Sequence, residues 1–137
     1  MEYSNLNTLS GNTADENHNG ILLKNSDHNT INNSNSINEN EFDGISLEDS
    51  NNNTITSNSI RNNYVGIYLE NSSYNSVNDN ILSGNGRCIE EEDCEGNVIE
   101  NNDCGEEEPI IFGYNLLFLM GIISLISIIL IKKQFKN

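Results

Sequence analysis

The chain has few basic residues. Its 137 residues include six lysines and arginines against 21 aspartates and glutamates, which gives a formal net charge of −15 at pH 7. A surface of this sign repels phosphates, so we exclude nucleic acid as a partner. Proline occurs once and tryptophan never, whereas asparagine supplies 28 residues. Low hydrophobicity with a large net charge is typical of disordered chains, but here Ile, Leu and Val recur in a regular pattern that indicates a folded domain.

The chain aligns with itself over most of its length. Three segments match without gaps and a fourth keeps part of the pattern: GILLKNSDHNTI (20–31), GISLEDSNNNTI (44–55), GIYLENSSYNSV (66–77) and CIEEEDCEGNVI (88–99). Their first residues are 24, 22 and 22 positions apart. Self-similarity at a period of this length is the sequence signature of a solenoid.

Each repeat contains a shorter period of five residues, as at Asn53, Asn58 and Asn63. A helix of 3.6 residues per turn would not keep five-residue steps on one face. Short strands do fit, because every second side chain points inward, with Tyr68 outward between two inward residues. Each repeat therefore predicts three short strands joined by tight corners. We expect an all-β fold over residues 1–104, a parallel β-helix of four to five coils of 22–24 residues.

Stacked coils explain the abundance of asparagine. Coils spaced ~4.8 Å apart place equivalent residues above one another, and a corner asparagine can then donate its amide to the asparagine of the next coil. The tolerance of asparagine for left-handed backbone geometry also suits a corner. The two extra residues of the second coil predict a bulged corner at residues 37–43. Two ladders are predicted: Asn7, Asn29, Asn53, Asn75 and Asn97, and a second of Asn12, Asn58, Asn80 and Asn102 that is interrupted at Ser34.

The first three repeats read glycine, isoleucine, any residue and leucine, followed by a polar stretch and Asn-Ser/Thr-Ile/Val. This pattern resembles the repeat of NosD-like right-handed parallel β-helix proteins. These belong to the wider group of carbohydrate-binding and sugar-hydrolysing β-helices. The resemblance covers residues 5–104 and implies a right-handed coil. NosD proteins carry a periplasmic copper-binding label. Copper sites need imidazole and sulfur groups that converge on one ion. The chain offers His18, His28 and two methionines without a cluster of soft ligands, so we expect no copper and no other cofactor.

Lys24, Glu48 and Glu70 occupy the same position in successive repeats and predict a stripe on the outer face. The stripe is a candidate binding surface for a glycan or a cation, and its alternative is a solvated face with one ion pair. Polysaccharide lyases and epimerases on this scaffold resemble one another in combining acidic and basic residues on one sheet, as general acid–base chemistry requires. We assign no catalytic residue here.

The fourth repeat differs from the others. Ten carboxylates lie between Glu90 and Glu108, a composition that favours a charged spacer and leaves calcium binding open. All three cysteines also lie in this part of the chain. Cys88 and Cys94 are the candidate disulfide, although an extended strand between them would hold their Cα atoms too far apart unless the coil bends. Cys104 matches an inward position and predicts a buried, small apolar side chain.

The composition changes after Pro109. The segment IIFGYNLLFLMGIISLISIILI, residues 110–131, carries no charge and is long enough to cross a bilayer as a helix of roughly 33 Å. The lysines that follow mark the cytoplasmic side. We expect an acidic linker at 105–109, a single transmembrane helix at 110–131 and a basic cytoplasmic tail at 132–137, with the β-helix outside. Because MEYSNLNTL matches the middle of a coil, the β-helix is expected to be the C-terminal part of a longer solenoid.

The sequence thus favours a membrane-anchored, surface-displayed β-helix that binds glycans or other surface partners without catalysis. Two alternatives remain. One is a fragment of a carbohydrate-active enzyme of the lyase or epimerase type, and the other is a purely structural stalk. Glycan binding separates the first interpretation from the stalk.

Overall fold

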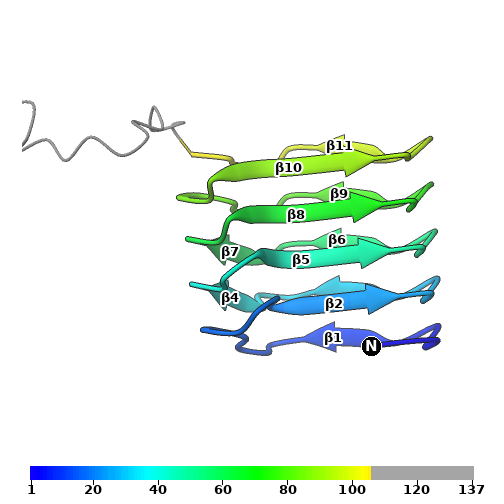
Figure 1. Ribbon diagram of the computed structural model, residues 1–137, viewed down its shortest axis with the longest axis horizontal. Coiled ribbons are helices and arrows are strands. Elements are labelled where there is room, and N and C mark those ends of the chain that lie inside the picture. The colour runs from blue at the N-terminus through cyan, green and yellow to red at the C-terminus, as the bar shows by residue number, and fades with distance from the viewer. Residues whose placement is uncertain (106–137) are drawn as a thin grey trace, which may run out of the picture.

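The computed structural model describes residues 1–105, and these residues form eleven β-strands and no helix (Figure 1). The strands are short because the chain turns a corner after every three to six residues. Their bounds are β1 Thr8–Ser10, β2 Ile21–Lys24, β3 Thr30–Asn32, β4 Ser36–Asn38, β5 Asp43–Glu48, β6 Thr54–Thr56, β7 Ser59–Arg61, β8 Val65–Glu70, β9 Ser76–Asn78, β10 Arg87–Glu92 and β11 Val98–Glu100.

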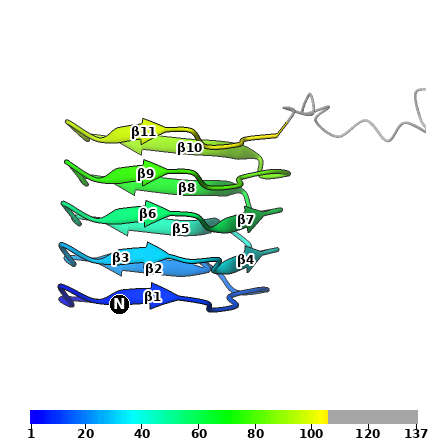
Figure 2. The same cartoon turned by 180° about the vertical axis from the view of Figure 1, so that it is seen from behind.

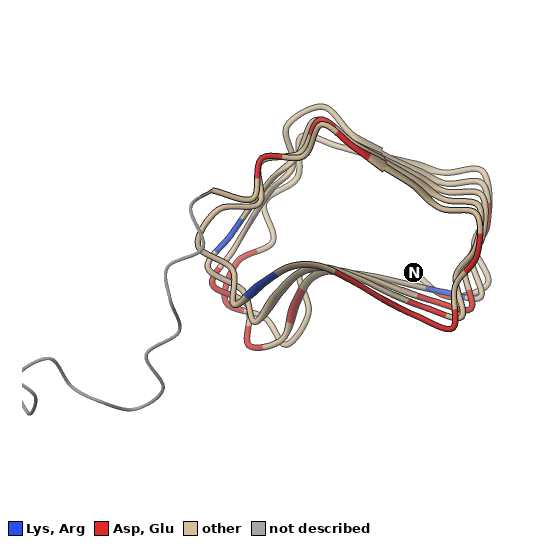
Figure 3. Cartoon of the chain, turned by 90° about the horizontal axis from the view of Figure 1, so that it is seen from above, with Lys and Arg blue, Asp and Glu red and all other residues tan. Residues whose placement is uncertain are grey.

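The strands form three parallel sheets, one along each side of a solenoid of about four turns. The sheet orders are β1-β3-β6-β9-β11, β10-β8-β5-β2 and β4-β7. Figure 2 shows the molecule from behind, with the five-stranded sheet in front. Viewed along the stack, the coils overlay one another (Figure 3). Each strand pairs with its equivalent one coil away, for example Ile45 with Ile67. The predicted all-β parallel solenoid is confirmed. Three strands form in the coils of β2-β3-β4 and β5-β6-β7, whereas in the next two coils the third side is reduced to isolated bridges at Ile81 and Asp103.

Alternation along each strand builds the core. Ile67 and Leu69 are fully buried, whereas Tyr68 between them reaches the surface. Each fully buried aliphatic side chain contributes roughly 1.5–3 kcal/mol relative to an exposed one. Stacking the coils joins these side chains into one continuous core: Ile21, Leu23, Ile31, Ile37, Ile45, Leu47, Ile55, Ile60, Ile67, Leu69, Val77 and Leu82.

The corners combine a left-handed residue with a buried polar one. Asn52 has φ of +56°, and the next residue, Asn53, is 1% exposed. The same order recurs at the other ladder asparagines, each of which follows a residue or glycine of positive φ. Left-handed geometry is therefore a property of the residue before the ladder asparagine, and not of the ladder asparagine itself as the sequence suggested. The turn aims the following amide into the coil.

Hydrogen bonds join the ladder asparagines from coil to coil. In the first ladder, the backbone N–H of Asn53 donates to Asn75 Oδ1 at 2.7 Å, and that of Asn75 donates to Asn97 Oδ1 at 2.7 Å. In the second ladder, Asn58 donates both its N–H and its Nδ2 to Asn80 Oδ1 at 3.0 Å. Both predicted ladders are present, and each satisfies backbone groups that the corner would otherwise leave buried and unpaired.

The predicted interruption of the second ladder at Ser34 is wrong. Asn35 takes that place, since its Oδ1 accepts from Asn12 and its Nδ2 donates to Asn58 Oδ1 at 2.8 Å. One extra residue of the second coil therefore lies in the corner just before Asn35, where both Asn33 and Ser34 have positive φ. The other lies at 41–42, inside the predicted bulge of residues 37–43.

Two further ladders were not predicted as such. One runs through the third asparagine of the five-residue rhythm: Asn17, Asn40, Asn63 and Asn85. In the other, the backbone N–H of one serine donates to the hydroxyl of the serine in the next coil, and the column ends at a thiol: Ser4, Ser26, Ser50, Ser72 and Cys94. Every corner of the coil therefore carries a polar column.

The disulfide joins Cys88 to Cys104, with Cα atoms 5.5 Å apart, and Cys94 is a free thiol. The predicted pair Cys88 and Cys94 is therefore wrong, because the strand between those residues stays extended. In an earlier coil, the positions equivalent to Cys88 and Cys104 are held by Gly44 and Ile60, which lie close together. A side chain added at Gly44 would overlap Ile60 Cγ2, and Gly44 and Ile60 are separated by the same 16 residues as the two cysteines. Cys104 is exposed at the end of the stack, not buried as expected.

The last coil places an exposed carboxylate in line with a column of core residues. Glu91 pairs with Leu69 and continues the inward column of Leu23 and Leu47. Its Oε1 accepts a hydrogen bond from Asn97 Nδ2 at 2.7 Å. An inward-pointing charge of this kind discourages the open edge of a sheet from pairing with another sheet.

The predicted transmembrane helix at 110–131 and the tail at 132–137 lie outside the described residues, as does the acidic linker after residue 105. Within residues 1–105, the structure contains no helix with the length and apolar character that a bilayer crossing requires.

Candidate functional site

The outer face of the sheet β10-β8-β5-β2 carries the predicted stripe. Lys24 pairs in register with Glu48, and Glu48 with Glu70, so the three side chains lie in one column. Lys24 Nζ and Glu48 Oε2 are 2.5 Å apart and form an ion pair. Glu92 extends the column by one coil. The stripe is therefore an acidic edge in which one carboxylate is already neutralised.

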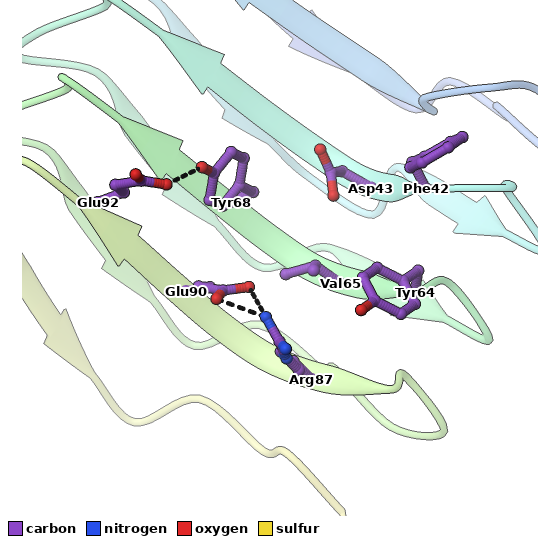
Figure 4. A pocket seen from close by; sticks show the side chains of 8 residues that line it. All are labelled: Phe42, Asp43, Tyr64, Val65, Tyr68, Arg87, Glu90 and Glu92. Atoms are coloured by element: carbon purple, nitrogen blue, oxygen red, sulfur yellow. Dashed lines mark hydrogen bonds and ion pairs between the residues drawn. The ribbon is translucent and has the colours of Figure 1, made fainter. Parts of the chain in front are cut away.

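A groove opens beside this stripe, nearer the N-terminal ends of the same strands. Its volume is about 340 Å³. The residues that line it come from three successive coils, from the corners before β5 and β8 to Glu92 at the end of β10 (Figure 4). The lining consists of three aromatic residues, three carboxylates, one arginine and one aliphatic residue: Phe42, Tyr64, Tyr68, Asp43, Glu90, Glu92, Arg87 and Val65.

Exposed aromatic rings form one side of the groove. Phe42 is 43% exposed and Tyr64 is 57% exposed. The guanidinium carbon of Arg87 lies 5.7 Å from the centre of the Tyr64 ring, within the range of a cation–π contact. The ring of His18 lies 4.2 Å from that of Phe42. Phe42 and Tyr64 occupy equivalent positions in successive coils, since the residues after them, Asp43 and Val65, pair in register.

The polar groups of the groove are held in defined pairs. Arg87 Nη1 donates to both oxygens of Glu90, at 2.5 and 2.7 Å. The Tyr68 hydroxyl donates to Glu92 Oε2 at 2.7 Å, and this bond to the carboxylate raises the pKa of Tyr68 well above its usual value. Burial raises the pKa of the half-buried Asp43 carboxyl, an effect partly offset by a hydrogen bond from Ser46. The groove therefore holds a strongly acidic but locally ordered set of groups.

Sequence reasoning found only part of this site. It placed Tyr68 outward on the correct sheet but did not join it to Phe42, Tyr64 or Arg87. A signal was available, because Phe42 and Tyr64 each stand two residues before the glycine that opens a repeat. Equivalent positions of stacked coils are neighbours in space, so a recurrent aromatic residue at one position predicts an aromatic surface.

The metal-binding groups of the described residues are scattered. His18 Nδ1 lies 3.2 Å from Glu41 Oε2 at the surface, and His28 is exposed in a corner of positive φ. Cys88 and Cys104 are joined in the disulfide. Within residues 1–105, no three His, Cys, Asp or Glu side chains converge in a way that would hold a metal ion.

Comparison with known proteins gives one family. A family model described as periplasmic copper-binding protein (NosD) matches residues 1–111. No curated protein matches the chain. No solved structure matches it either. The described residues do not fit the copper in that description, because soft imidazole and thiolate ligands would have to converge and these residues do not bring them together.

Proposed function

Since the chain belongs to the family described as periplasmic copper-binding protein (NosD), we propose that its solenoid is displayed outside the cytoplasmic membrane and binds glycans there. The family description supports the location. The mode of binding rests on the groove, and no step in this proposal involves copper.

The observation that carries the proposal is the combination of groups in the groove. Sugars present apolar C–H faces and many hydroxyl groups, so a glycan site needs flat aromatic surfaces beside hydrogen-bonding side chains. The groove offers Tyr64 and Phe42 as exposed rings and Asp43, Glu90 and Glu92 as acceptors. Pockets that bind small ligands usually join an apolar surface to a few fixed polar groups in this way.

Catalysis is not part of the proposal. Among the residues that the structure describes, Arg87 is the basic side chain that lines the groove, and its Nη1 donates to both oxygens of Glu90. This pairing offsets the positive charge that would stabilise the negative charge developing on a sugar during elimination or epimerisation. We therefore assign the groove to binding and positioning.

Anchoring completes the proposal and rests on the sequence. The uncharged run at 110–131 has the length of a membrane span, and three lysines follow it. A single span with this polarity would keep the solenoid on the outer side of the membrane. The acidic residues just before it would hold the solenoid away from an anionic lipid surface.

Binding of the full-length chain, solubilised in detergent, to a glycan array tests the proposal. We expect a subset of glycans to bind, and Tyr64→Ala to abolish or strongly weaken that binding because the ring forms a wall of the groove. Tyr74→Ala is the matched control: this ring is 58% exposed, close to the 57% of Tyr64, but lies outside the groove. Its binding should equal that of the parent.

Two results would refute the proposal. If no glycan binds, the structural-stalk alternative takes its place. If Tyr64→Ala and Tyr74→Ala bind as the parent does, glycans bind elsewhere on the chain and the groove is not the site. Release of shortened or epimerised glycans during the incubation would refute the non-enzymatic part.

A further inference from the structure

The groove is rich in hydrogen-bond acceptors. Asp43, Glu90 and Glu92 contribute three carboxylates, and Arg87 contributes one positive charge that is paired with Glu90. The formal charge of the lining is therefore three negative charges less one positive charge, or −2. The stripe beside it adds the carboxylate of Glu70.

Two donors in the groove are engaged: the Tyr68 hydroxyl donates to Glu92, and Arg87 Nη1 donates to Glu90. Carboxylates outnumber the arginine, so a ligand that brings a negative charge meets net repulsion. A ligand that brings N–H donors and a positive charge finds acceptors on both sides of the groove, where charge-assisted hydrogen bonds are roughly twice as strong as neutral ones.

We propose that the groove of β5, β8 and β10 selects glycans whose sugars carry protonated amines, with one ammonium group beside Asp43, another farther along the strands beside Glu92, and a sugar ring against Tyr64. This inference rests on the proposed glycan-binding function and names its ligand class. It excludes uronic acids, whose carboxylates would face the groove carboxylates.

A bare metal ion is a poorer ligand for the same groups. The carboxylates are distributed along the groove and do not converge as a set of three, within residues 1–105, on one point. An amino sugar does not meet this difficulty, because one ammonium group needs only one carboxylate while its ring contacts the aromatic wall.

The size of the groove agrees with this ligand. A volume of about 340 Å³ lies near the lower end of the range for small-molecule sites and matches one or two sugar rings. Short oligosaccharides are therefore suitable probes. They also limit the diffuse attraction that a long polycation would feel toward a chain of net charge −15.

Calorimetric titration of the full-length chain in detergent tests the inference with three ligands of equal length. These are a glucosamine trisaccharide, its fully N-acetylated form and a galacturonic acid trisaccharide. Acetylation keeps the ring and removes the charge. We expect the amine form to bind about tenfold more tightly than the acetylated form, and the uronic acid form to bind most weakly.

Variants separate the groove from the overall charge. In the double variant Asp43→Asn, Glu92→Gln, the preference for the amine form should disappear, while the amide oxygen introduced at position 92 can still accept the Tyr68 hydroxyl. The control Asp79→Asn, Glu100→Gln removes the same charge from exposed side chains outside the groove and should keep the preference. Circular dichroism establishes that each variant is folded.

The outcomes distinguish this inference from the proposed function. Equal binding of amine and acetylated forms, or tighter binding of the uronic acid form, overturns the inference and leaves glycan binding standing. Loss of the preference in both double variants also overturns it, since the attraction is then diffuse. If glycans of every class fail to bind, including those of the array, the proposed function and the inference are both overturned.

Discussion

Replacing Asn80 with alanine should destabilise the solenoid more than its size suggests. The side chain is 1% exposed and lies in the second ladder, between Asn58 and Asn102. Its Oδ1 accepts from the backbone N–H and the Nδ2 of Asn58, both at 3.0 Å. Its Nδ2 donates to Asn102 Oδ1 at 2.9 Å and to the carbonyls of Ile55 and Asn78 at 3.0 Å.

The magnitude follows from the groups left without partners. In Asn80→Ala the buried N–H of Asn58 loses its acceptor, and an orphaned buried polar group costs about 1–3 kcal/mol. We take about 2 kcal/mol for the variant, which is a large part of the roughly 5–15 kcal/mol that stabilises a typical domain. For a domain of this size such a loss lowers Tm by roughly 8–16 °C.

Asn12→Ala is the matched control in the same ladder. Asn12 is exposed at the first coil, and its Nδ2 donates to Ser10 O and Asn35 Oδ1. Its loss leaves no buried group unpaired, because Asn35 Oδ1 still accepts the backbone N–H of Asn12. Thermal melts followed by far-ultraviolet circular dichroism compare the two. If both variants melt with the parent, or shift equally, the ladder does not stabilise the fold in the way described.

Three further perturbations test other parts of the structure. Ile67→Asp should unfold the domain because it buries an unpaired charge, whereas Ile81→Asp, at a side chain that is 41% exposed, should melt close to the parent; equal melts would contradict the inward assignment. Reduction of the Cys88–Cys104 disulfide should cost about 3 kcal/mol, since it opens a loop of some 16 residues; a melt unchanged by reductant would show that the cross-link is not formed. Glu91→Leu should promote end-to-end association, measured by sedimentation velocity in detergent; a variant that sediments as the parent does would refute the role of the inward charge.

The repeat made the fold predictable from the sequence. Because equivalent residues of stacked coils are neighbours, one alignment of the chain with itself fixes the strand register, the inward residues and two of the ladders. The alignment failed where a single residue is inserted. Ser34 was taken as the ladder residue because the step of five was assumed to hold, and the insertion before Asn35 shifted the ladder by one position.

The disulfide was harder to predict because it joins different sides of a coil, and the repeat alignment reports only contacts along a column. Cys88 meets Cys104 across the coil as Gly44 meets Ile60, a distance that strand spacing alone does not provide. In the groove, the alignment places Phe42 above Tyr64, but the bonds of Arg87 to Glu90 and of Tyr68 to Glu92 depend on side-chain conformations that it does not report.

The most direct test of the account is to map a bound glycan on the protein by nuclear magnetic resonance. Full-length chain labelled with ¹⁵N, in detergent micelles, would be titrated with the tightest-binding glycan of the array. We predict that the largest shift changes lie at Tyr64, Tyr68 and Arg87, on the face of β5, β8 and β10, while the sheet β1-β3-β6-β9-β11 stays unchanged. Shift changes confined to that five-stranded sheet would contradict the central claim that the groove is the binding site.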